Sequence, residues 1–361
     1  MDVAGRAARL RERVDEAGCD ALLVTRMVNV RYLTGFSGSA AMLLVLPDRL
    51  AFVTDGRYRD QSAEELAAAG VEADLRVATQ SKELLQEAAK GWVRIGLEAE
   101  SVTWGQQQRF ASDWFPDAEL VSTSGLVEAL RLVKDAGEVD RMARAAAAAD
   151  AALAAVRHRL ADRPTESEFA LDLDVEMRRH GASGSSFETI VAAGPNGAKP
   201  HHRPSDRRIE AGELVVIDFG AIVDGYCSDM TRTLCVGEPA STTARRMVEV
   251  VEESQRAGVA AVKAGMEAKD VDEVCRAVIA DAGWADAFLH GTGHGVGLEI
   301  HEAPRVGSTS TETLAAGYVV TVEPGVYLPE HGGVRIEDTV VVTDDGCQIL
   351  TNAPKELVVS A

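Results

Sequence analysis

The chain has 361 residues, 46% of them apolar and 26% charged, and its formal net charge is −20. This composition is typical of a globular protein and excludes disordered and fibrous classes. The length predicts two domains, and the negative charge argues against nucleic acid and anionic membranes as partners. Five scattered cysteines without a CxxC pair, an N-terminus without a signal-peptide pattern and apolar runs of strand length predict a reduced, cytoplasmic protein outside the membrane.

The first 128 residues alternate between helical and strand patterns. Apolar residues at helical spacing predict helices, which cover residues 4–18, 58–70 and a stretch ending near Phe115. Short apolar runs predict strands over residues 20–25 and 93–98, and a hairpin of 40–47 with 50–55. The alternation predicts a small α/β domain over residues 1–128.

A second texture follows, with helices first and then strands with helices between them. Thr165 is the expected N-cap of a helix, and Glu168 closes a capping box with it. The other helices are predicted over residues 145–155, 243–263 and onward from Ala268. Strands are predicted over residues 188–194, 214–223, 226–236, 318–328, 333–343 and 347–351. The order predicts an α+β domain over residues 129–361, and the whole chain is therefore expected to be α+β.

Two aspartates stand at strand positions where a lone carboxylate is costly to bury. Asp224-Gly225 is a strong hairpin-turn signal, and that turn would place Asp218 opposite Thr231. Asp229 is then a diagonal neighbour of Asp218, about 7–8 Å away at Cα. A divalent cation between the two would relieve their repulsion. The alternative is that Asp218 caps a turn and Asp229 pairs with Arg232.

Further candidate ligands lie in three later segments. A glycine-rich segment, residues 290–304, carries three of the eight histidines and is predicted to be a loop near a ligand. Glu323 ends an apolar strand at a Pro-Gly turn. In residues 333–343, alternation sends Val334 and Ile336 to one face and Arg335 and Glu337 to the other. Four carboxylates and one imidazole suit two divalent ions such as Mn²⁺, Co²⁺, Fe²⁺ or Zn²⁺, which activate water for hydrolysis of a carbonyl.

The segments that carry these residues resemble the pita-bread metallopeptidases, specifically the aminopeptidase P and prolidase branch. They read "IDFGAIVDGYCSDMTRT", "HGTGHGVGLEIHE", "TVEPGVY" and "GGVRIEDT". The segments "NVRYLTGFSGSAAMLLV" and "VTDGRY" resemble the creatinase/prolidase N-terminal domain, so the resemblance covers nearly the whole chain. It implies a creatinase-like α/β domain followed by a catalytic pita-bread domain.

The resemblance also implies roles for individual residues. The implied metal ligands, with Asp229 and Glu337 shared by both ions, are Asp218, Asp229, His294, Glu323 and Glu337. Glu323 is the implied general base, and Arg335 orients a ligand. His201 is expected near the leaving group, with His202 as a competitor, and His301 near the substrate carbonyl. His290, Arg305 and Tyr327 match substrate-binding positions, and Arg305 matches an arginine that binds a dipeptide's carboxylate.

The implied activity is hydrolysis of the bond between an N-terminal residue and a following proline in di- or oligopeptides. Two divalent ions, Mn²⁺ foremost, and a homodimer are expected with it. The sequence leaves open whether the enzyme is a dipeptidase or an aminopeptidase. One alternative is an enzyme like methionine aminopeptidase, which usually lacks the N-terminal domain. Others are a pita-bread aminopeptidase of different specificity and a non-catalytic peptide-binding module. Creatinase has both domains without the full ligand set.

Overall fold

The computed structural model describes residues 1–79 and 81–360 and divides into two compact units, Met1–Arg131 and Leu132–Ala361. No helix in the described part of the chain combines the length and the apolar character that crossing a bilayer requires.

The first unit is built on one mixed six-stranded sheet with the strand order β4-β3-β2-β1-β5-β6. Strand β1 pairs antiparallel with β2 and parallel with β5. The strands are β1 (Ala21–Val24), β2 (Ala41–Val45), β3 (Leu50–Thr54), β4 (Asp74–Val77), β5 (Arg94–Glu98) and β6 (Glu119–Thr123). The helices are α1 (Arg6–Glu16), α2 (Met27–Thr34), α3 (Arg59–Ala68), α4 (Lys82–Ala88), α5 (Trp104–Arg109) and α6 (Glu128–Arg131), with shorter turns η1 (Gly56–Tyr58) and η2 (Phe110–Trp114).

The expected elements of this unit are present, but the sequence patterns gave no signal for α2, α4, α6, β4 and β6. Leu85 of α4 and Phe110 of η2 pack with Leu23, Leu44 and Ile95 in one buried cluster. Strand β4 is an edge strand without an apolar stripe, so no alternation marks it, and its pairing with β3 makes it a strand.

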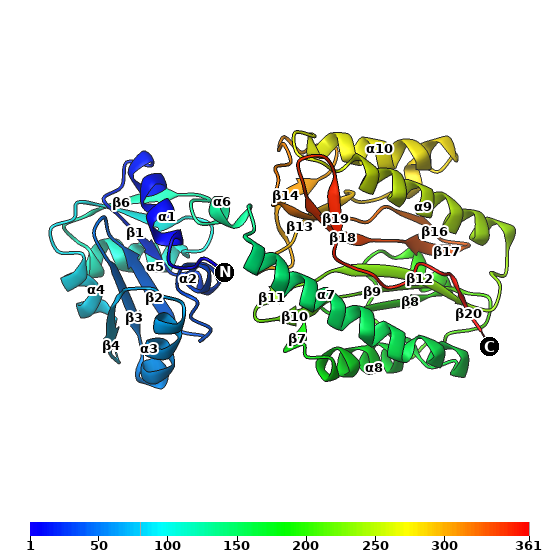
Figure 1. Ribbon diagram of the computed structural model, residues 1–361, viewed down its shortest axis with the longest axis horizontal. Helices are drawn as coiled ribbons and strands as arrows, with labels where there is room; N and C mark the ends of the chain where they lie inside the picture. Colours follow the sequence, from blue (N-terminus) through cyan, green and yellow to red (C-terminus); the bar gives the residue numbers. More distant parts are fainter. Residues whose placement is uncertain (80, 361) are drawn as a thin grey trace. The chain divides into compact units, whose positions relative to one another are not determined.

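The second unit places strands between two pairs of helices. Figure 1 shows α7 and α8 on one side of the strands and α9 and α10 on the other. Their bounds are α7 (Ala136–Val156), α8 (Glu166–Arg179), α9 (Thr242–Ala261) and α10 (Ala268–Asp281), and the short turns are η3 (Arg157–Asp162), η4 (Gly194–Ala198) and η5 (Ala285–Ala287). The expected capping box of Thr165 with Glu168 at the start of α8 is confirmed.

Four small sheets lie between these helices, in the orders β20-β12-β9-β8, β14-β13-β15-β18-β19, β11-β10-β7 and β16-β17. Their strands are β7 (Gly184–Ser185), β8 (Ile190–Ala193), β9 (Leu214–Phe219), β10 (Ala221–Val223), β11 (Tyr226–Cys227), β12 (Met230–Val236), β13 (Gly293–Gly295), β14 (Glu302–Val306), β15 (Val319–Val322), β16 (Gly325–Leu328), β17 (Gly332–Arg335), β18 (Asp338–Val342), β19 (Cys347–Ile349) and β20 (Val358–Val359). Several predicted strands are therefore split, because the chain passes from one sheet to another within them.

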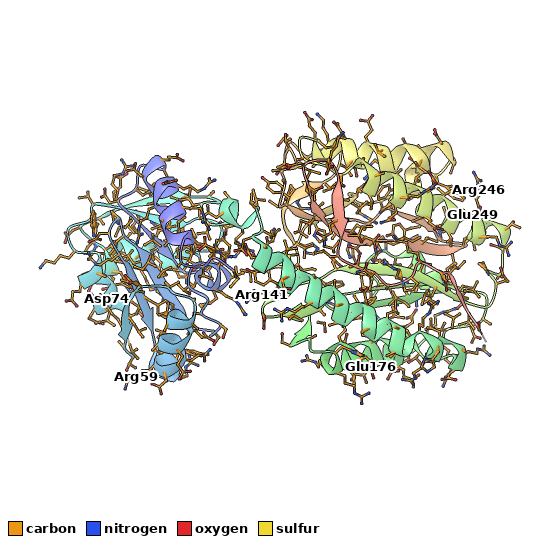
Figure 2. The ribbon with its side chains drawn as sticks, viewed as in Figure 1. Arg59, Asp74, Arg141, Glu176, Arg246 and Glu249 are labelled. Carbon is orange, nitrogen blue, oxygen red and sulfur yellow. The ribbon has the colours of Figure 1, made fainter. Side chains whose placement is uncertain are left out.

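Each helix pair covers its own buried apolar cluster. Phe169 of α8 belongs to one cluster with Ile217 of β9, whereas Val251 of α9 belongs to another with Val322 of β15. Charged residues on the opposite side of α9, such as Arg246 and Glu249, are exposed, and Figure 2 shows where they lie on this helix. The amphipathic helices thus bury both outer faces of the strands and leave the polar residues of the inner strands to form a site.

Candidate metal centre

Asp218 and Asp229 are brought together by the register of β9 and β12. Asp218 is paired with Thr231 across the two strands, as the sequence predicted from the Asp224-Gly225 turn. Both turn residues have positive φ, 48° and 83°, which a two-residue hairpin turn of this type requires. Asp229 stands one residue before β12, diagonally across from Asp218.

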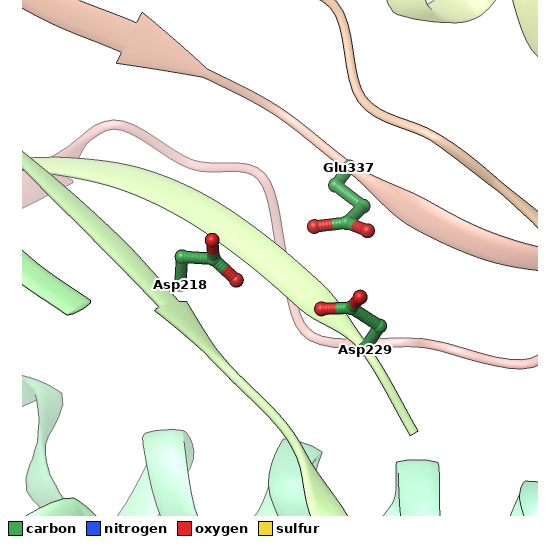
Figure 3. Close-up of side chains that lie close together, drawn as sticks. All are labelled: Asp218, Asp229 and Glu337. Atoms are coloured by element: carbon green, nitrogen blue, oxygen red, sulfur yellow. The ribbon is translucent and has the colours of Figure 1, made fainter. Parts of the chain in front are cut away.

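Glu337 completes a group of three carboxylates. It lies between β17 and β18, and its side chain is buried. Figure 3 shows its carboxylate pointing toward those of Asp218 and Asp229, and one oxygen from each lies within 4.8 Å of the others. The hydroxyl of Thr231 donates a hydrogen bond to Glu337 Oε2 at 2.7 Å and fixes that carboxylate.

His294 and Glu323 approach the same group. His294 Nε2 lies 3.5 Å from Asp229 Oδ2 and 3.4 Å from Glu323 Oε1. The other ring nitrogen, Nδ1, lies 3.0 Å from the Gly295 carbonyl, which a protonated Nδ1 would satisfy. Burial lowers the pKa of His294 to about 4, so the imidazole is neutral and Nε2 faces the carboxylates with a free lone pair. The segment was predicted to be a loop, but His294 lies on the short strand β13.

The buried carboxylates repel one another. Burial, and then the charges of neighbouring carboxylates, raises the pKa of both Asp229 and Glu337 well above the usual range. Burial raises the pKa of Glu323 to about 8. The positive charge of Arg335 opposes this shift, and the negative charge of Asp218 adds to it. Two buried oxygens, Asp218 Oδ1 and Glu337 Oε1, accept no hydrogen bond from any described residue. Oxygens of this kind are the donors that a hard divalent cation takes, so the residues present fit a divalent metal centre.

Arg335 connects the centre to a chain of hydrogen bonds. Its guanidinium donates to Asp218 Oδ2 at 2.5 Å and to the Tyr327 hydroxyl at 2.8 Å. That hydroxyl lies 2.7 Å from His290 Nε2, and His290 Nδ1 lies 2.8 Å from the Gly291 carbonyl. Burial lowers the pKa of His290 to about 4, so the neutral ring donates from Nδ1 and accepts the Tyr327 proton at Nε2.

Arg232 does not pair with Asp229, which excludes the alternative that the sequence left open. Its guanidinium instead lies 3.0 Å from Asp338, and both side chains are fully buried. Arg232 also donates to the backbone carbonyl of Glu337. Sequence reasoning missed this pair and the role of Thr231, although the predicted register already placed Thr231 opposite Asp218.

The sequence matches the profile of metallopeptidase family M24 over residues 140–344 and that of the creatinase/prolidase N-terminal domain over residues 6–133. The chain belongs to metallopeptidase family M24. It is therefore an enzyme with the two-domain architecture that the sequence predicted, and this family implies a divalent metal.

Relatives and solved structures agree with this assignment to family M24. A Xaa-Pro dipeptidase of Pyrococcus furiosus is 36% identical, with 98% of this chain and 99% of the relative covered. The structure of a Xaa-Pro dipeptidase from Bacillus anthracis superposes with a TM-score of 0.94 at 39% identity, covering 99% of each chain. The structure of an X-Pro aminopeptidase from Thermotoga maritima gives a TM-score of 0.89 at 33% identity, covering 97% of this chain and all of the other.

Of the other histidines expected at this site, His201 and His301 are exposed, whereas His202 lies against a buried carboxylate. The ring of His301 lies 4.4 Å from that of His294 between centroids, and its side chain is exposed. His201 is also exposed, and its charge contributes to lowering the pKa of His301, after the larger effects of burial and Arg305. His202, the competitor of His201, has its Nε2 2.9 Å from the buried carboxylate of Glu166. Arg305 is exposed on β14, paired in register with His294.

Proposed function

We propose that this protein is a two-metal Xaa-Pro peptidase that hydrolyses the bond between an N-terminal residue and a following proline. The observation that carries the proposal is the group of Asp218, Asp229 and Glu337, two of whose buried oxygens accept no hydrogen bond from the described residues, with His294 and Glu323 beside it. Relatives named Xaa-Pro dipeptidase and X-Pro aminopeptidase over the full chain length support the proline preference.

The five ligands serve two ions in this proposal. Asp218 would hold one ion, His294 and Glu323 would hold the second, and Asp229 and Glu337 would be shared. When bound, two divalent ions lower the pKa of a water molecule and polarise the scissile carbonyl. The oxygen-rich ligand set favours Mn²⁺, with Co²⁺, Fe²⁺ and Zn²⁺ as the alternatives.

The residues of the chain handle the protons and the substrate. Glu323, whose Oε1 lies 3.4 Å from His294 Nε2 in the proposed ligand set, accepts the proton of the attacking water. His201 delivers a proton to the proline nitrogen, which has no N–H and leaves only when protonated. His301 donates a hydrogen bond to the carbonyl oxygen as negative charge develops on it.

Substrate binding falls to residues around this group. His290 and Tyr327, which are hydrogen-bonded to each other, form a wall beside Arg335. Arg305 is exposed close to His294 and suits a free C-terminal carboxylate, so a dipeptide is the expected substrate. A homodimer and a cytoplasmic location stay predictions.

An assay with matched peptides tests the proposal. The purified protein is analysed for metal, loaded with Mn²⁺ and given Ala-Pro, Ala-Pro-Ala and Met-Ala-Ala. Release of proline from Ala-Pro supports the dipeptidase, and release of alanine from Ala-Pro-Ala supports aminopeptidase P. Cleavage of Met-Ala-Ala without cleavage of either proline peptide would show a different specificity. Inactivity toward all three, with no metal bound, would overturn the proposal.

A further inference from the structure

Glu166, the first residue of α8, carries a carboxylate that is completely buried. Both of its oxygens accept hydrogen bonds from one distant segment, residues 193–205, which we name the His201 loop. Oε1 accepts from the backbone N–H of Ala193 at 2.8 Å and from Asn196 Nδ2 at 3.1 Å. Oε2 accepts from Ser205 Oγ at 2.6 Å and its N–H at 3.1 Å, and it lies 2.9 Å from His202 Nε2.

The carboxylate of Glu166 is ionised despite its burial. Burial alone would raise its pKa, but the hydrogen bonds from Ala193, Ser205, His202 and Asn196 together lower the pKa below its usual value. An ionised carboxylate can only accept hydrogen bonds, so His202 Nε2 must carry the proton that faces it. A buried charge held by so many donors ties them to one position, because releasing any of them leaves the charge less compensated.

The cap of α8 does not need this carboxylate. The helix start is already closed by the capping box, in which Thr165 Oγ1 accepts from the Glu168 N–H and Glu168 accepts from the Thr165 N–H. The Glu166 carboxylate is therefore not used to cap its own helix, and its hydrogen bonds hold the His201 loop.

The metal centre holds the other side of the same loop. A side chain at Gly197 would place a Cβ 2.9 Å from the backbone nitrogen of Gly333, so η4 packs backbone to backbone against β17. Arg335, which donates to Asp218, also donates to the Pro200 carbonyl at 3.3 Å. His201 follows Pro200 directly, and it stands between the anchor at Glu166 and the anchor at Arg335.

We propose that Glu166 is a positioning residue for catalysis, which holds the His201 loop so that the His201 imidazole stays at the leaving-group side of the metal centre. This inference rests on the role of His201 in the proposed function. Among the described residues, the Glu166 carboxylate is hydrogen-bonded to the His201 loop and to none of the proposed metal ligands, so it acts through His201, with His202 serving as a structural partner of Glu166. A loosened loop would still bind substrate but would deliver the proton to the proline nitrogen less often.

The test uses Glu166→Gln, His201→Ala and the double variant in the Mn²⁺-loaded full-length protein. Gln replaces one acceptor oxygen by an NH₂ group that faces donors, so the loop loses part of its anchor. Glu166→Gln should lower kcat for Ala-Pro by about 10- to 100-fold, the range of other residues that orient a catalytic group, with KM nearly unchanged. It should cause no further loss in the His201→Ala background. A loss that multiplies that of His201→Ala would overturn the inference.

Asp150→Asn is the matched control for loss of stability. Asp150 lies on α7 and likewise anchors a distant segment, because it accepts the backbone N–H groups of Asn352 and Ala353. This variant should lower the melting temperature and leave kcat unchanged. An equal loss of kcat in both variants at equal loss of stability would show a merely structural role and would overturn the proposal.

Amide hydrogen exchange separates this inference from the proposed function. Glu166→Gln should speed exchange in peptides covering residues 193–205, whether or not the enzyme cleaves Ala-Pro. Unchanged slow exchange there overturns the anchoring role by itself. If the wild-type protein is inactive and Glu166→Gln still speeds exchange in this loop, the proposed function is refuted and the anchoring role is supported. A fully active His201→Ala variant overturns the inference, because Glu166 then has no catalytic group to act through.

Discussion

The Thr231 hydroxyl is hydrogen-bonded to Glu337, at 2.7 Å between Oγ1 and Oε2. The same hydroxyl accepts from Arg335 Nε at 3.1 Å, so one small side chain links the guanidinium on Asp218 to the most buried carboxylate of the centre. Because a hydroxyl has a single proton, the bond from Arg335 directs that proton to Glu337. The second oxygen, Oε1, is left for a cation.

Thr231→Val should therefore weaken metal binding with little loss of packing, because valine has nearly the same shape as threonine. We expect Mn²⁺ affinity or kcat to fall by about 10- to 100-fold, as for other groups that orient a metal ligand. Mn²⁺ titration with a proline-release assay measures both. Thr233→Val is the control: among the described residues, that hydroxyl is hydrogen-bonded to the backbone of Arg335, so metal affinity should hold. Equal losses in the two variants would contradict the role of Thr231.

Glu337→Gln should have opposite effects on the metal-free and the metal-loaded protein. Removing one charge relieves repulsion with Asp229, so the melting temperature in EDTA should rise above that of the wild type. Activity should drop by more than about a hundredfold, beyond the loss typical of supporting residues, and Mn²⁺ should no longer raise the melting temperature. Differential scanning calorimetry with and without Mn²⁺ measures both effects. Full turnover in this variant would show that Glu337 is not a shared ligand.

Stability of the metal-free protein should fall as the pH rises from about 6.5 to 8. Glu323 has a pKa of about 8 in the folded state and 4.5 ordinarily, so the folded state binds more protons in this window and loses stability as they leave. His290 and His294, whose pKa values fall from 6.5 to about 4, oppose this trend near pH 6.5, where the histidines of the unfolded chain still release protons, so the fall in stability is steepest above about pH 7.

Melting temperatures in EDTA across this pH range check the trend. The fall should be smaller in Glu323→Gln, which cannot ionise at this position, and smaller with Mn²⁺ bound. A melting temperature that rises between pH 6.5 and 8 would contradict the assigned sign.

Arg305→Gln should impair dipeptides more than longer substrates. A hydrogen bond to a charged group contributes about 1.5–3 kcal/mol, so KM for Ala-Pro should rise by about tenfold or more. Ala-Pro-Ala, whose carboxylate lies one residue farther away, should be affected less. Steady-state kinetics on both peptides measure the two KM values. Arg245→Gln, which removes an exposed charge on α9, is the control for loss of a surface charge. Equal changes for both peptides would remove Arg305 from carboxylate recognition.

The features that the sequence predicted well are local in origin. An Asp-Gly turn sets the register of its own hairpin, which is why the pairing of Asp218 with Thr231 could be predicted and is confirmed. The side-chain period of two likewise separated Val334 and Ile336, which are in the apolar core, from Arg335 and Glu337.

Tertiary structure decided the features that depend on distant partners. The segment 333–343 is divided between β17 and β18 because its two halves pair with different strands. Arg232 binds Asp338 instead of the nearer Asp229, and His202 binds Glu166, 36 residues away in sequence. Sequence alone thus determined the residue types, their spacing and the local register. The fold decided which charges meet, because a buried charge takes its partner from whatever segments the packing brings beside it.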